Sequence, residues 1–549
     1  MSDTTTVLIV GAGFAGLGTA IQLLERGIED FVILERAGEV GGTWRDNTYP
    51  GAACDIPSLL YSYSFEPNPN WSRAYSESGE ILDYIRGLVD KHGLSRFIRF
   101  HVNVTGLAFD EDSGTWRADT DGGPSYRART VVMASGPLAN ANWPDIRGLD
   151  SYLGHKIHSA RWDHDYDMSD KRVAVIGTGA SAVQIVPELV KTARSVKVFQ
   201  RTPGWVLPRP DFPHPRVAKA AFGRLPILQS AAREAWFWAH EVMAVGMVWD
   251  TPATTAISWL GKANLRRQVK DPWMRRQLTP DFRPGCKRML MTSDYYPALQ
   301  RDNCKLVTWP IATISPNGIR TADGIEHEVD CIVFATGFDV CKAGTPFPIS
   351  GVDGRKLEDE WSSGAYAYKS VSVSGYPNLF FTFGPNSGPG HNSALVYMEA
   401  EIRYIVDAIG VIIDRGLQTF DVKEDRQNRY HAQLQRRLAA TTWNSGCKSW
   451  YLTEDGYNGT MYPGFANQFV RQMAKVELDD YAMTSQPSPH KKTRARPELV
   501  VGGLHGASNK VRVQSNGDPV SPGEPKRRAV RRSAKTTSSD TAQRTADGA

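Results

Sequence analysis

The sequence predicts an α/β protein that contains two dinucleotide-binding, Rossmann-like domains. Two glycine-rich loops support this prediction: G-A-G-F-A-G at residues 11–16 and G-T-G-A-S-A at residues 177–182. Each loop follows a short apolar run and precedes a helical pattern, which is the strand–loop–helix context that such a loop needs to bind a pyrophosphate. Two nucleotide sites in one chain indicate a redox enzyme with two cofactors.

The composition fits a large globular enzyme and argues against several other classes. With 549 residues, 41% of them hydrophobic, the chain can bury large cores in several domains. It has no run of 18 apolar residues, and its N-terminus has no basic region or cleavage site, so we expect neither a spanning helix nor secretion. The six cysteines are scattered without a C-x-x-C pair. This argues against a disulfide framework, a zinc site or a dithiol redox centre, and favours a reducing cytoplasm.

The net charge of +5 is unevenly distributed along the chain. Residues 484–549 hold 13 Lys and Arg and 5 Asp and Glu, a net charge of +8. The rest of the chain holds 51 Lys and Arg and 54 Asp and Glu, a net charge of −3. Since the tail has few large apolar residues, we expect residues 486–549 to be disordered. The positive charge of this tail allows a weak contact with a membrane surface. The alternative is that the tail is a solvated extension without a partner. We expect no nucleic-acid partner.

The first glycine loop lies between two predicted strands. The first glycine permits a tight turn, the second a close approach of the backbone to the pyrophosphate, and the third close packing of helix on strand. The helix N-terminus offers free N–H groups to the phosphates. Glu35 ends the second strand and can accept hydrogen bonds from ribose hydroxyls. The candidate cofactor contacts here are Gly11, Gly13, Phe14, Ala15, Gly16, Glu35 and Arg36.

The second loop differs from the first at the end of its following strand. That strand ends at Gln200 and Arg201, where the first unit has Glu35. An arginine can pair with a 2′-phosphate that an acid would repel, so Arg201 and Thr202 favour NADPH over NADH. A surface arginine at a strand end is the alternative. The candidate contacts are Gly177, Thr178, Gly179, Ala180, Ser181, Gln184, Arg201 and Thr202.

The chain organisation is read from two further strands that end in small residues, at 130–136 and 331–337. They resemble the chain crossings of flavoproteins in which an FAD domain is split around an NADPH domain. That resemblance implies an FAD domain at residues 1–140 and 325–485, an NADPH domain at 141–324, and a tail at 486–549.

Residues about 212–280 look helical and form an insertion in the second domain. A Trp-rich run at residues 235–249 is too short, and too interrupted by His240 and Glu241, to span a bilayer. Three interpretations of this run are open: an interfacial helix, a lid over an apolar substrate tunnel, or a helix buried in the protein.

Two longer motifs resemble those of the Baeyer–Villiger monooxygenase family. The family fingerprint begins with an aromatic residue, usually Phe, and its positions are filled here by Tyr152, Gly154, His158, Trp162 and Asp163. A second family pattern is filled at every defined position by Gly42, Trp44, Tyr49, Pro50, Gly51 and Asp55. The resemblance covers residues 1–485 and leaves out the tail.

The resemblance also assigns site residues. Asp55 would lie beside the flavin and nicotinamide rings, Lys287 would add a second cation to the NADPH 2′-phosphate, and Arg288 would be the catalytic arginine. Trp450 would close over the nicotinamide nucleotide. His158 lies in the segment between the two domains, and from that position we assign it to domain coupling. The sequence of the loop at residues 384–392 differs from the usual motif of the family. Further flavin-side contacts are expected from Gly42, Thr43, Trp44, Asp46, Tyr61, Val104, Asn386 and Asn392.

The activity implied by the resemblance is insertion of one oxygen of O2 next to a ketone carbonyl, giving an ester or lactone through a C4a-peroxyflavin, with FAD and NADPH as cofactors. Arg288 would stabilise the negative charge that develops, an effect that typically contributes ~10²–10³ in rate, and Asp55 would hold it in place. A thioether is an alternative substrate. A flavin monooxygenase that oxygenates nitrogen or sulfur, and a flavin-binding sensor without turnover, are the alternative functions. The ketone and the oligomeric state are left open.

Overall fold

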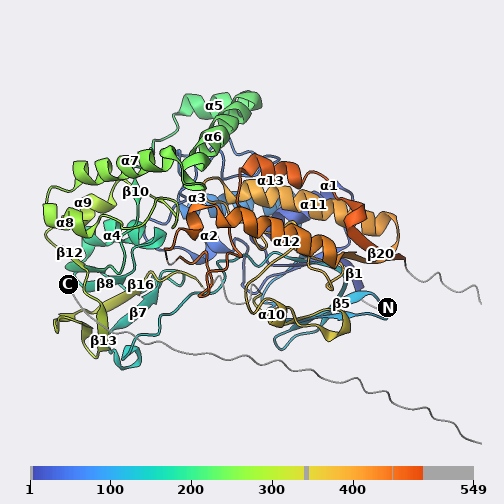
Figure 1. Ribbon diagram of the computed structural model, residues 1–549, viewed down its shortest axis with the longest axis horizontal. Coiled ribbons are helices and arrows are strands. Elements are labelled where there is room, and N and C mark those ends of the chain that lie inside the picture. The colour runs from blue at the N-terminus through green and yellow to red at the C-terminus, as the bar shows by residue number, and fades with distance from the viewer. Residues whose placement is uncertain (1–3, 339–344, 448, 486–549) are drawn as a thin grey trace, which may run out of the picture. The chain divides into compact units, whose positions relative to one another are not determined.

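The computed structural model describes residues 4–338, 345–447 and 449–485, and Figure 1 shows their arrangement. Within this part, an eight-stranded sheet has the order β17-β4-β5-β6-β1-β2-β3, with β18 also paired to β6. β1 runs parallel to β2 and β6, whereas β4, β5 and β6 pair antiparallel. The strands are β1 (Thr4–Val10), β2 (Phe31–Leu34), β3 (Ile98–Arg99), β4 (Val104–Asp110), β5 (Thr115–Thr120), β6 (Tyr126–Met133), β17 (Ile349–Ser350) and β18 (Leu379–Phe381).

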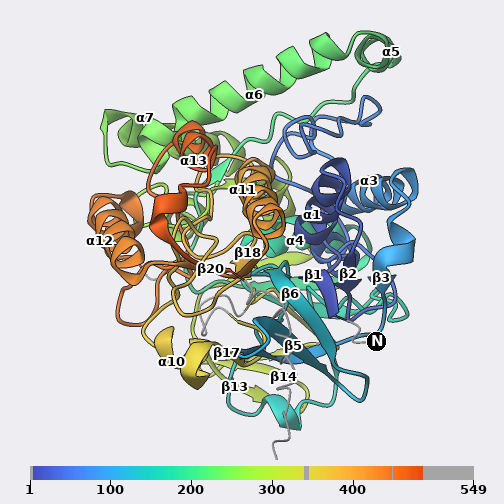
Figure 2. The same cartoon turned by 90° about the vertical axis from the view of Figure 1, so that its right-hand side faces the viewer.

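Alternate side chains of β1 enter different cores, as the geometry of a strand requires. Val7 and Ile9 pack with the helices, while Leu8 and Val10 pack with the core on the other face. The apolar run is therefore continuous because both faces of the strand are covered. Figure 2 shows α1 (Phe14–Glu25), α3 (Ser78–Lys91) and α11 (Ala394–Asp414) together on one side of the sheet.

A second sheet has five strands, all parallel, in the order β12-β9-β8-β16-β7. Its strands are β7 (His155–His158), β8 (Arg172–Ile176), β9 (Ser195–Phe199), β12 (Cys304–Val307) and β16 (Cys331–Phe334). α4 (Ala180–Thr192) and α9 (Tyr295–Leu299) pack together beside it.

Two sheets with Rossmann-like parallel strands confirm the predicted fold class, and the first sheet takes strands from both sides of the second in sequence. One boundary needs correction. The division at residue 325 would place β16 in the first sheet, whereas β16 lies between β8 and β7 in the second. The chain therefore returns to the first sheet after Phe334. A buried parallel strand has the same apolar pattern in either sheet, so the sequence pattern does not show to which sheet the strand belongs.

Smaller elements complete the described chain. They are α2 (Thr43–Asp46), α10 (Leu357–Glu360), α12 (Glu424–Ala439), α13 (Ala466–Gln472), β10 (Val206–Leu207), β11 (Leu290–Met291), β13 (Ile311–Ser315), β14 (Gly318–Thr321), β15 (Glu326–Glu328), β19 (Leu417–Val422) and β20 (Tyr481–Ser485), with short 3₁₀ turns between them.

The predicted helical insertion is present as four consecutive helices. They are α5 (Arg216–Arg224), α6 (Pro226–Met247), α7 (Pro252–Gln268) and α8 (Pro272–Gln277). A proline opens α6, α7 and α8, where its missing N–H costs nothing. Thr251 and Thr254 form a capping box, and the Asp271 carboxylate caps α8. Among the described helices, none is long and apolar enough to cross a membrane.

A buried carboxylate helps to fix the long helix α6 to the rest of the protein. Glu241 accepts hydrogen bonds from the backbone N–H groups of Ala466 and Asn467, at 3.0 and 3.1 Å, at the start of α13. Its Oε1 also accepts from Asn392 Nδ2 and lies 3.0 Å from His391 Nε2. Burial raises the pKa of the Glu241 carboxyl, but these hydrogen bonds outweigh burial and hold that pKa below its ordinary value. The polar residue that interrupts the apolar run is thus one of the anchors of the helix.

Glu241→Gln should lower the free energy of unfolding by about 2–4 kcal/mol, because two buried N–H groups would face a neutral amide in place of a charged acceptor. Since its pKa is lowered in the folded protein, the carboxylate stabilises the wild type fully above about pH 4.5, its ordinary pKa, and less as the pH falls below that. Denaturant unfolding at pH 7 and pH 4, with hydrogen exchange in α6 and α13, measures both effects. Glu234→Gln, an exposed carboxylate on the same helix, is the control. Equal stability of the two variants would contradict the anchoring role.

Candidate active site

Both glycine loops close against the end of a neighbouring strand. Gly11 has φ +108°, and a Cβ there would lie 2.6 Å from the carbonyl oxygen of Ala134. Gly177 has φ +123°, and its Cβ would lie 2.3 Å from the carbonyl oxygen of Ala335. A Cβ on Gly16 would lie 1.9 Å from the Gly11 carbonyl. The first glycine of each loop is therefore required by φ and by space, and the small residues after the two crossing strands lie against it.

The helices after the loops begin without a side-chain cap. Gly13 and Gly179 are the N-cap residues of α1 and α4, and neither helix receives a capping hydrogen bond from a side chain. Their first N–H groups are thus available to an anion such as a pyrophosphate. The candidate contacts Phe14, Ala15, Gly16, Ala180 and Ser181 lie in the first turns of these helices, and Gln184 lies in the second turn of α4.

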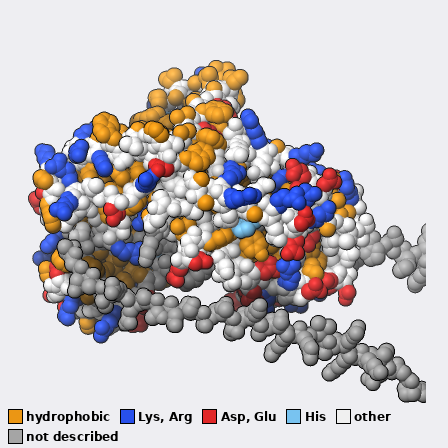
Figure 3. Space-filling model, viewed as in Figure 1, with side chains coloured by type: hydrophobic (Ala, Val, Ile, Leu, Met, Phe, Trp, Pro, Cys, Tyr) orange, Lys and Arg blue, Asp and Glu red, His pale blue; other side chains and the backbone are white. Residues whose placement is uncertain are grey.

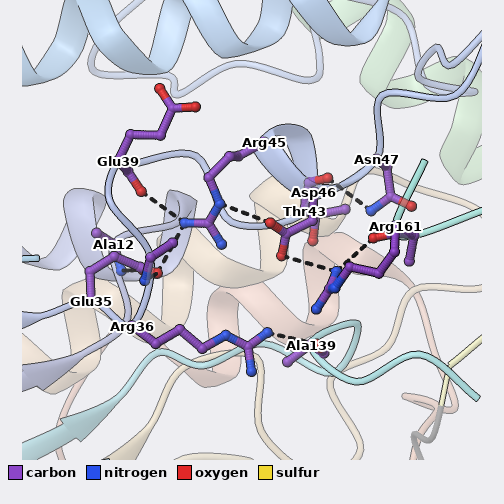
Figure 4. Close-up of polar contacts among 12 residues, drawn as sticks. Ala12, Glu35, Arg36, Glu39, Thr43, Arg45, Asp46, Asn47, Ala139 and Arg161 are labelled. Carbon is purple, nitrogen blue, oxygen red and sulfur yellow. Dashed lines mark hydrogen bonds and ion pairs between the residues drawn. The ribbon is translucent and has the colours of Figure 1, made fainter. Parts of the chain in front are cut away.

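Glu35 is buried at the end of β2, beside the first loop. Its carboxylate accepts from the N–H groups of Ala12 and Ala37 at 2.8 and 2.9 Å. Neighbouring Arg36 turns away and donates to the carbonyl of Ala139 at 2.7 Å (Figure 4). These contacts hold Glu35 at the strand end, where a ribose contact was predicted, and place Arg36 against the first crossing segment.

A chain of charges connects Glu35 to the fingerprint segment (Figure 4). Arg45 Nη1 donates to Glu35 at 3.0 Å, and its Nε donates to Asp46 at 2.8 Å. The other oxygen of Asp46 lies 3.7 Å from Nη1 of Arg161. Sequence reasoning named Asp46 but missed Arg45 and Arg161, whose contacts with Glu35 and Asp46 are seen only in the fold.

The motif loop at residues 41–55 packs directly on α4 of the second unit. Gln184 accepts from the Tyr49 hydroxyl at 2.9 Å and donates to the Ala53 carbonyl at 3.0 Å. Gly51 has φ +79°, and a Cβ there would lie 2.8 Å from the Gln184 carbonyl. Gln184 was predicted as a nucleotide contact, and its side chain joins the two units.

The predicted flavin-side residues at the start of this loop lie together. Trp44 Nε1 donates to the Tyr61 hydroxyl at 3.1 Å, and the Tyr61 ring meets Phe14 edge-on at 5.7 Å. A Cβ on Gly42 would lie 3.2 Å from Cα of Gly13, so the two loops touch through their glycines. Of the other candidates, Thr43 starts α2 and Val104 is buried in β4.

Asp55 and Arg288, 233 residues apart, form a bidentate ion pair. Arg288 Nε lies 2.8 Å from one carboxylate oxygen and Nη2 lies 2.6 Å from the other. Burial raises the pKa of Asp55, but the charge and hydrogen bonds of Arg288 outweigh it and hold that pKa below its ordinary value. Asp55 in turn raises the pKa of Arg288. Both groups therefore stay charged at neutral pH.

The loop that carries Arg288 is fixed from two sides. Gly285 has φ +90°, and a Cβ there would lie 2.3 Å from the carbonyl of Met247 at the end of α6. Cys286 forms a disulfide with Cys447, 161 residues away. The scattered cysteines argued against a disulfide framework, and this disulfide was not predicted: two cysteines so far apart in sequence carry no spacing signal, and only the fold brings them together.

Lys287 and Arg201 lie near each other at the second nucleotide site. Burial lowers the pKa of Lys287, and the positive charge of Arg201 lowers it further, with Asp281 opposing. The Thr178 hydroxyl donates to the Thr202 carbonyl at 2.8 Å, which fixes the glycine loop to the Arg201 segment. Two neighbouring cations beside an uncapped helix fit a phosphorylated nucleotide.

All the predicted cofactor contacts remain predictions, and the surroundings of three of them are as follows. Trp450 is half-exposed and its ring lies 4.5 Å from that of Tyr451, a buried neighbour of Arg288. Asn386 donates to the carbonyls of Asn458 and Met461, and Asn392 donates to Glu241, so both amides hold protein segments.

The buried ring of His158 contacts both crossing segments. It packs against Trp143 with ring centroids 5.4 Å apart, and its Nε2 lies 3.4 Å from the Thr336 hydroxyl. This position agrees with the proposed role in domain coupling. In the same fingerprint, a Cβ on Gly154 would lie 2.3 Å from the Tyr152 hydroxyl, so this position also needs glycine.

Two dinucleotide loops, one followed by an acid and the other by two cations, define an oxidoreductase with two nucleotide cofactors. Residues 8–215 match the family model described as "Pyridine nucleotide-disulphide oxidoreductase". The chain is 40% identical over 519 residues to a Baeyer–Villiger monooxygenase of Pseudomonas aeruginosa, covering 94% of this chain and 95% of that one. A Baeyer–Villiger monooxygenase of Streptomyces coelicolor is 39% identical, with 92% and 97% covered.

Solved structures give the same result. A steroid monooxygenase bound to NADP matches with a TM-score of 0.78 and 31% identity, and a closed cyclohexanone monooxygenase with a TM-score of 0.79 and 27% identity. Each match covers 88% of this chain and 100% of the other. The chain belongs to the Baeyer–Villiger monooxygenase family, which confirms the prediction of family and enzyme class.

Arg201→Ala should lower kcat/KM for NADPH by about 10- to 100-fold and leave that for NADH nearly unchanged, because only NADPH brings a 2′-phosphate to the two cations. Initial rates with each nucleotide measure this. Arg194→Ala, an exposed arginine at the opposite end of β9, is the control. An unchanged NADPH/NADH ratio would show that Arg201 does not contact the phosphate.

Proposed function

We propose that this monooxygenase uses NADPH, FAD and O2 to convert a ketone into an ester or lactone, and that the Asp55–Arg288 pair serves the oxygen-insertion step. The observation that carries the proposal is the bidentate ion pair between the motif loop and the loop after α8. A cytoplasmic location, where NADPH is available, is part of the proposal.

The residues present fit both cofactors. The loop at Gly11 and the uncapped α1 would hold the FAD pyrophosphate, with Glu35 at the ribose. The loop at Gly177, with Arg201 and Lys287, would hold NADPH. Bound FAD, reduced by NADPH, supplies the activated oxygen.

Arg288 would stabilise negative charge on the substrate. Its guanidinium stays charged at any working pH, and Asp55 holds it in a fixed orientation before the reaction begins. As a ketone is converted, charge develops on the carbonyl oxygen, and a fixed cation lowers the energy of that state more than the energy of the neutral ketone. Asp55 acts through Arg288 and is a positioning residue. Oxygenation of a thioether develops no such carbonyl oxyanion, so the pair favours a ketone.

Arg288→Ala should reduce ester formation about 10²–10³-fold. The variant should still bind FAD and still be reduced by NADPH at an appreciable rate, because that half-reaction precedes the charge that Arg288 stabilises. Asp55→Ala should show a milder defect of the same kind. Stopped-flow absorbance without oxygen, followed by product quantification with a panel of linear, cyclic and aryl ketones and a thioether, separates the two half-reactions.

Arg276→Ala, an exposed arginine of α8, is the matched control and should retain wild-type ester formation. Ester formation by Arg288→Ala at the wild-type rate would refute the assigned role. A wild type that yields sulfoxide from the thioether but no ester from any ketone would favour the sulfur-oxygenating alternative. Absence of any oxygenated product would favour the sensor.

A further inference from the structure

Large apolar side chains that face solvent concentrate on the helical insertion. Of the 17 described ones that are exposed, 11 lie between residues 212 and 273, so their distribution is not that of scattered surface residues. Figure 3 shows hydrophobic side chains gathered over α5, α6 and α7. We define the apolar face as Leu225, Ile227, Leu228, Trp238, Val242, Val245, Trp259 and Leu260.

The apolar face belongs to well-anchored helices. On α6, Trp238, Val242 and Val245 follow at helical spacing, and Val242 and Ile227 are 73% and 75% exposed. The same helix packs against α5 and α7 and buries Glu241 in four hydrogen-bond contacts. Its outer side chains therefore stay exposed although the helix itself is held in place, which leaves an apolar surface without a partner in the described chain.

The charge around the apolar face indicates its partner. Residues 212–280 contain ten Lys or Arg and four Asp or Glu, a net of +6. Six of the cations lie on the helices next to α6, namely Arg216, Lys219 and Arg224 of α5 and Lys262, Arg266 and Arg267 of α7. Trp238 and Trp259 are of the residue type that prefers the level of lipid headgroups. We propose that the insertion docks through this face on a membrane surface that contains anionic lipid.

The alternatives fit less well. The described helices include none long and apolar enough to cross a bilayer, so α6 would lie in the plane of the interface with its apolar side chains among the headgroups. A second copy of the chain would bring two faces of the same positive charge together. A membrane surface with anionic lipid matches both features, because its headgroups pair with the cations and its acyl boundary accepts the apolar side chains.

Sedimentation with lipid vesicles tests the proposal on the full-length holoenzyme. Vesicles of three parts phosphatidylcholine to one part phosphatidylglycerol should bind the enzyme, and vesicles of phosphatidylcholine alone should bind it more weakly. W238S/V242S should lower partitioning onto the mixed vesicles about tenfold, because two apolar side chains no longer enter the interface. The basic tail is the same in every variant, so its electrostatic contribution stays constant.

W309S/I325S is the matched control, since Trp309 and Ile325 are 59% and 52% exposed outside the insertion. This variant should bind vesicles like the wild type, and FAD content with far-UV circular dichroism checks that both double variants fold. Equal vesicle binding by W238S/V242S and wild type would overturn the proposal. So would a change from dimer to monomer in sedimentation velocity without a change in vesicle binding, which would make the face a contact between copies of the chain.

Discussion

The ion pair between Asp55 and Arg288 depends on contacts that come from both nucleotide units and from α6. Its partners come from loops 233 residues apart, and neither loop has regular structure of its own at the contact. Asp55 is placed because Gln184 ties the motif loop to α4. Arg288 is placed because Gly285 packs against the end of α6 and Cys286 is bonded to Cys447. A partly buried ion pair adds little net stability, so its position at the meeting point of two nucleotide units argues for a chemical role.

The two nucleotide units show how one backbone geometry serves two ligands. In both, the first glycine lies against the carbonyl of an alanine, Ala134 or Ala335, that ends a neighbouring strand. The units differ at the end of the next strand, where one has the buried carboxylate of Glu35 and the other has Arg201 with Lys287 nearby. The backbone supplies N–H groups to phosphates in either case, and the charge at the strand end distinguishes a ribose from a 2′-phosphate.

Sequence reasoning reached the fold class, both loops, the helical insertion and the residues of the central ion pair, because each depends on local pattern or on a motif of fixed spacing. It missed Arg45, Arg161 and the disulfide, whose partners meet only in three dimensions. It also placed β16 in the wrong sheet, since a buried parallel strand has no pattern that names its neighbours. Glu241 is instructive in a different way. In sequence it counted only as a charge that interrupts an apolar run, whereas in the fold that charge fixes the helix.

Helix α6 joins the surface of the protein to its central ion pair. Its outer side presents Trp238 and Val242 to solvent, while its C-terminal carbonyl at Met247 accepts from the Thr442 hydroxyl at 2.5 Å and packs on Gly285. His240 on the same helix is close enough to Asp55 for the carboxylate charge to raise the pKa of the imidazole, although burial lowers it more. The same helix therefore carries the exposed apolar side chains and the backbone carbonyl that packs on the loop of Arg288.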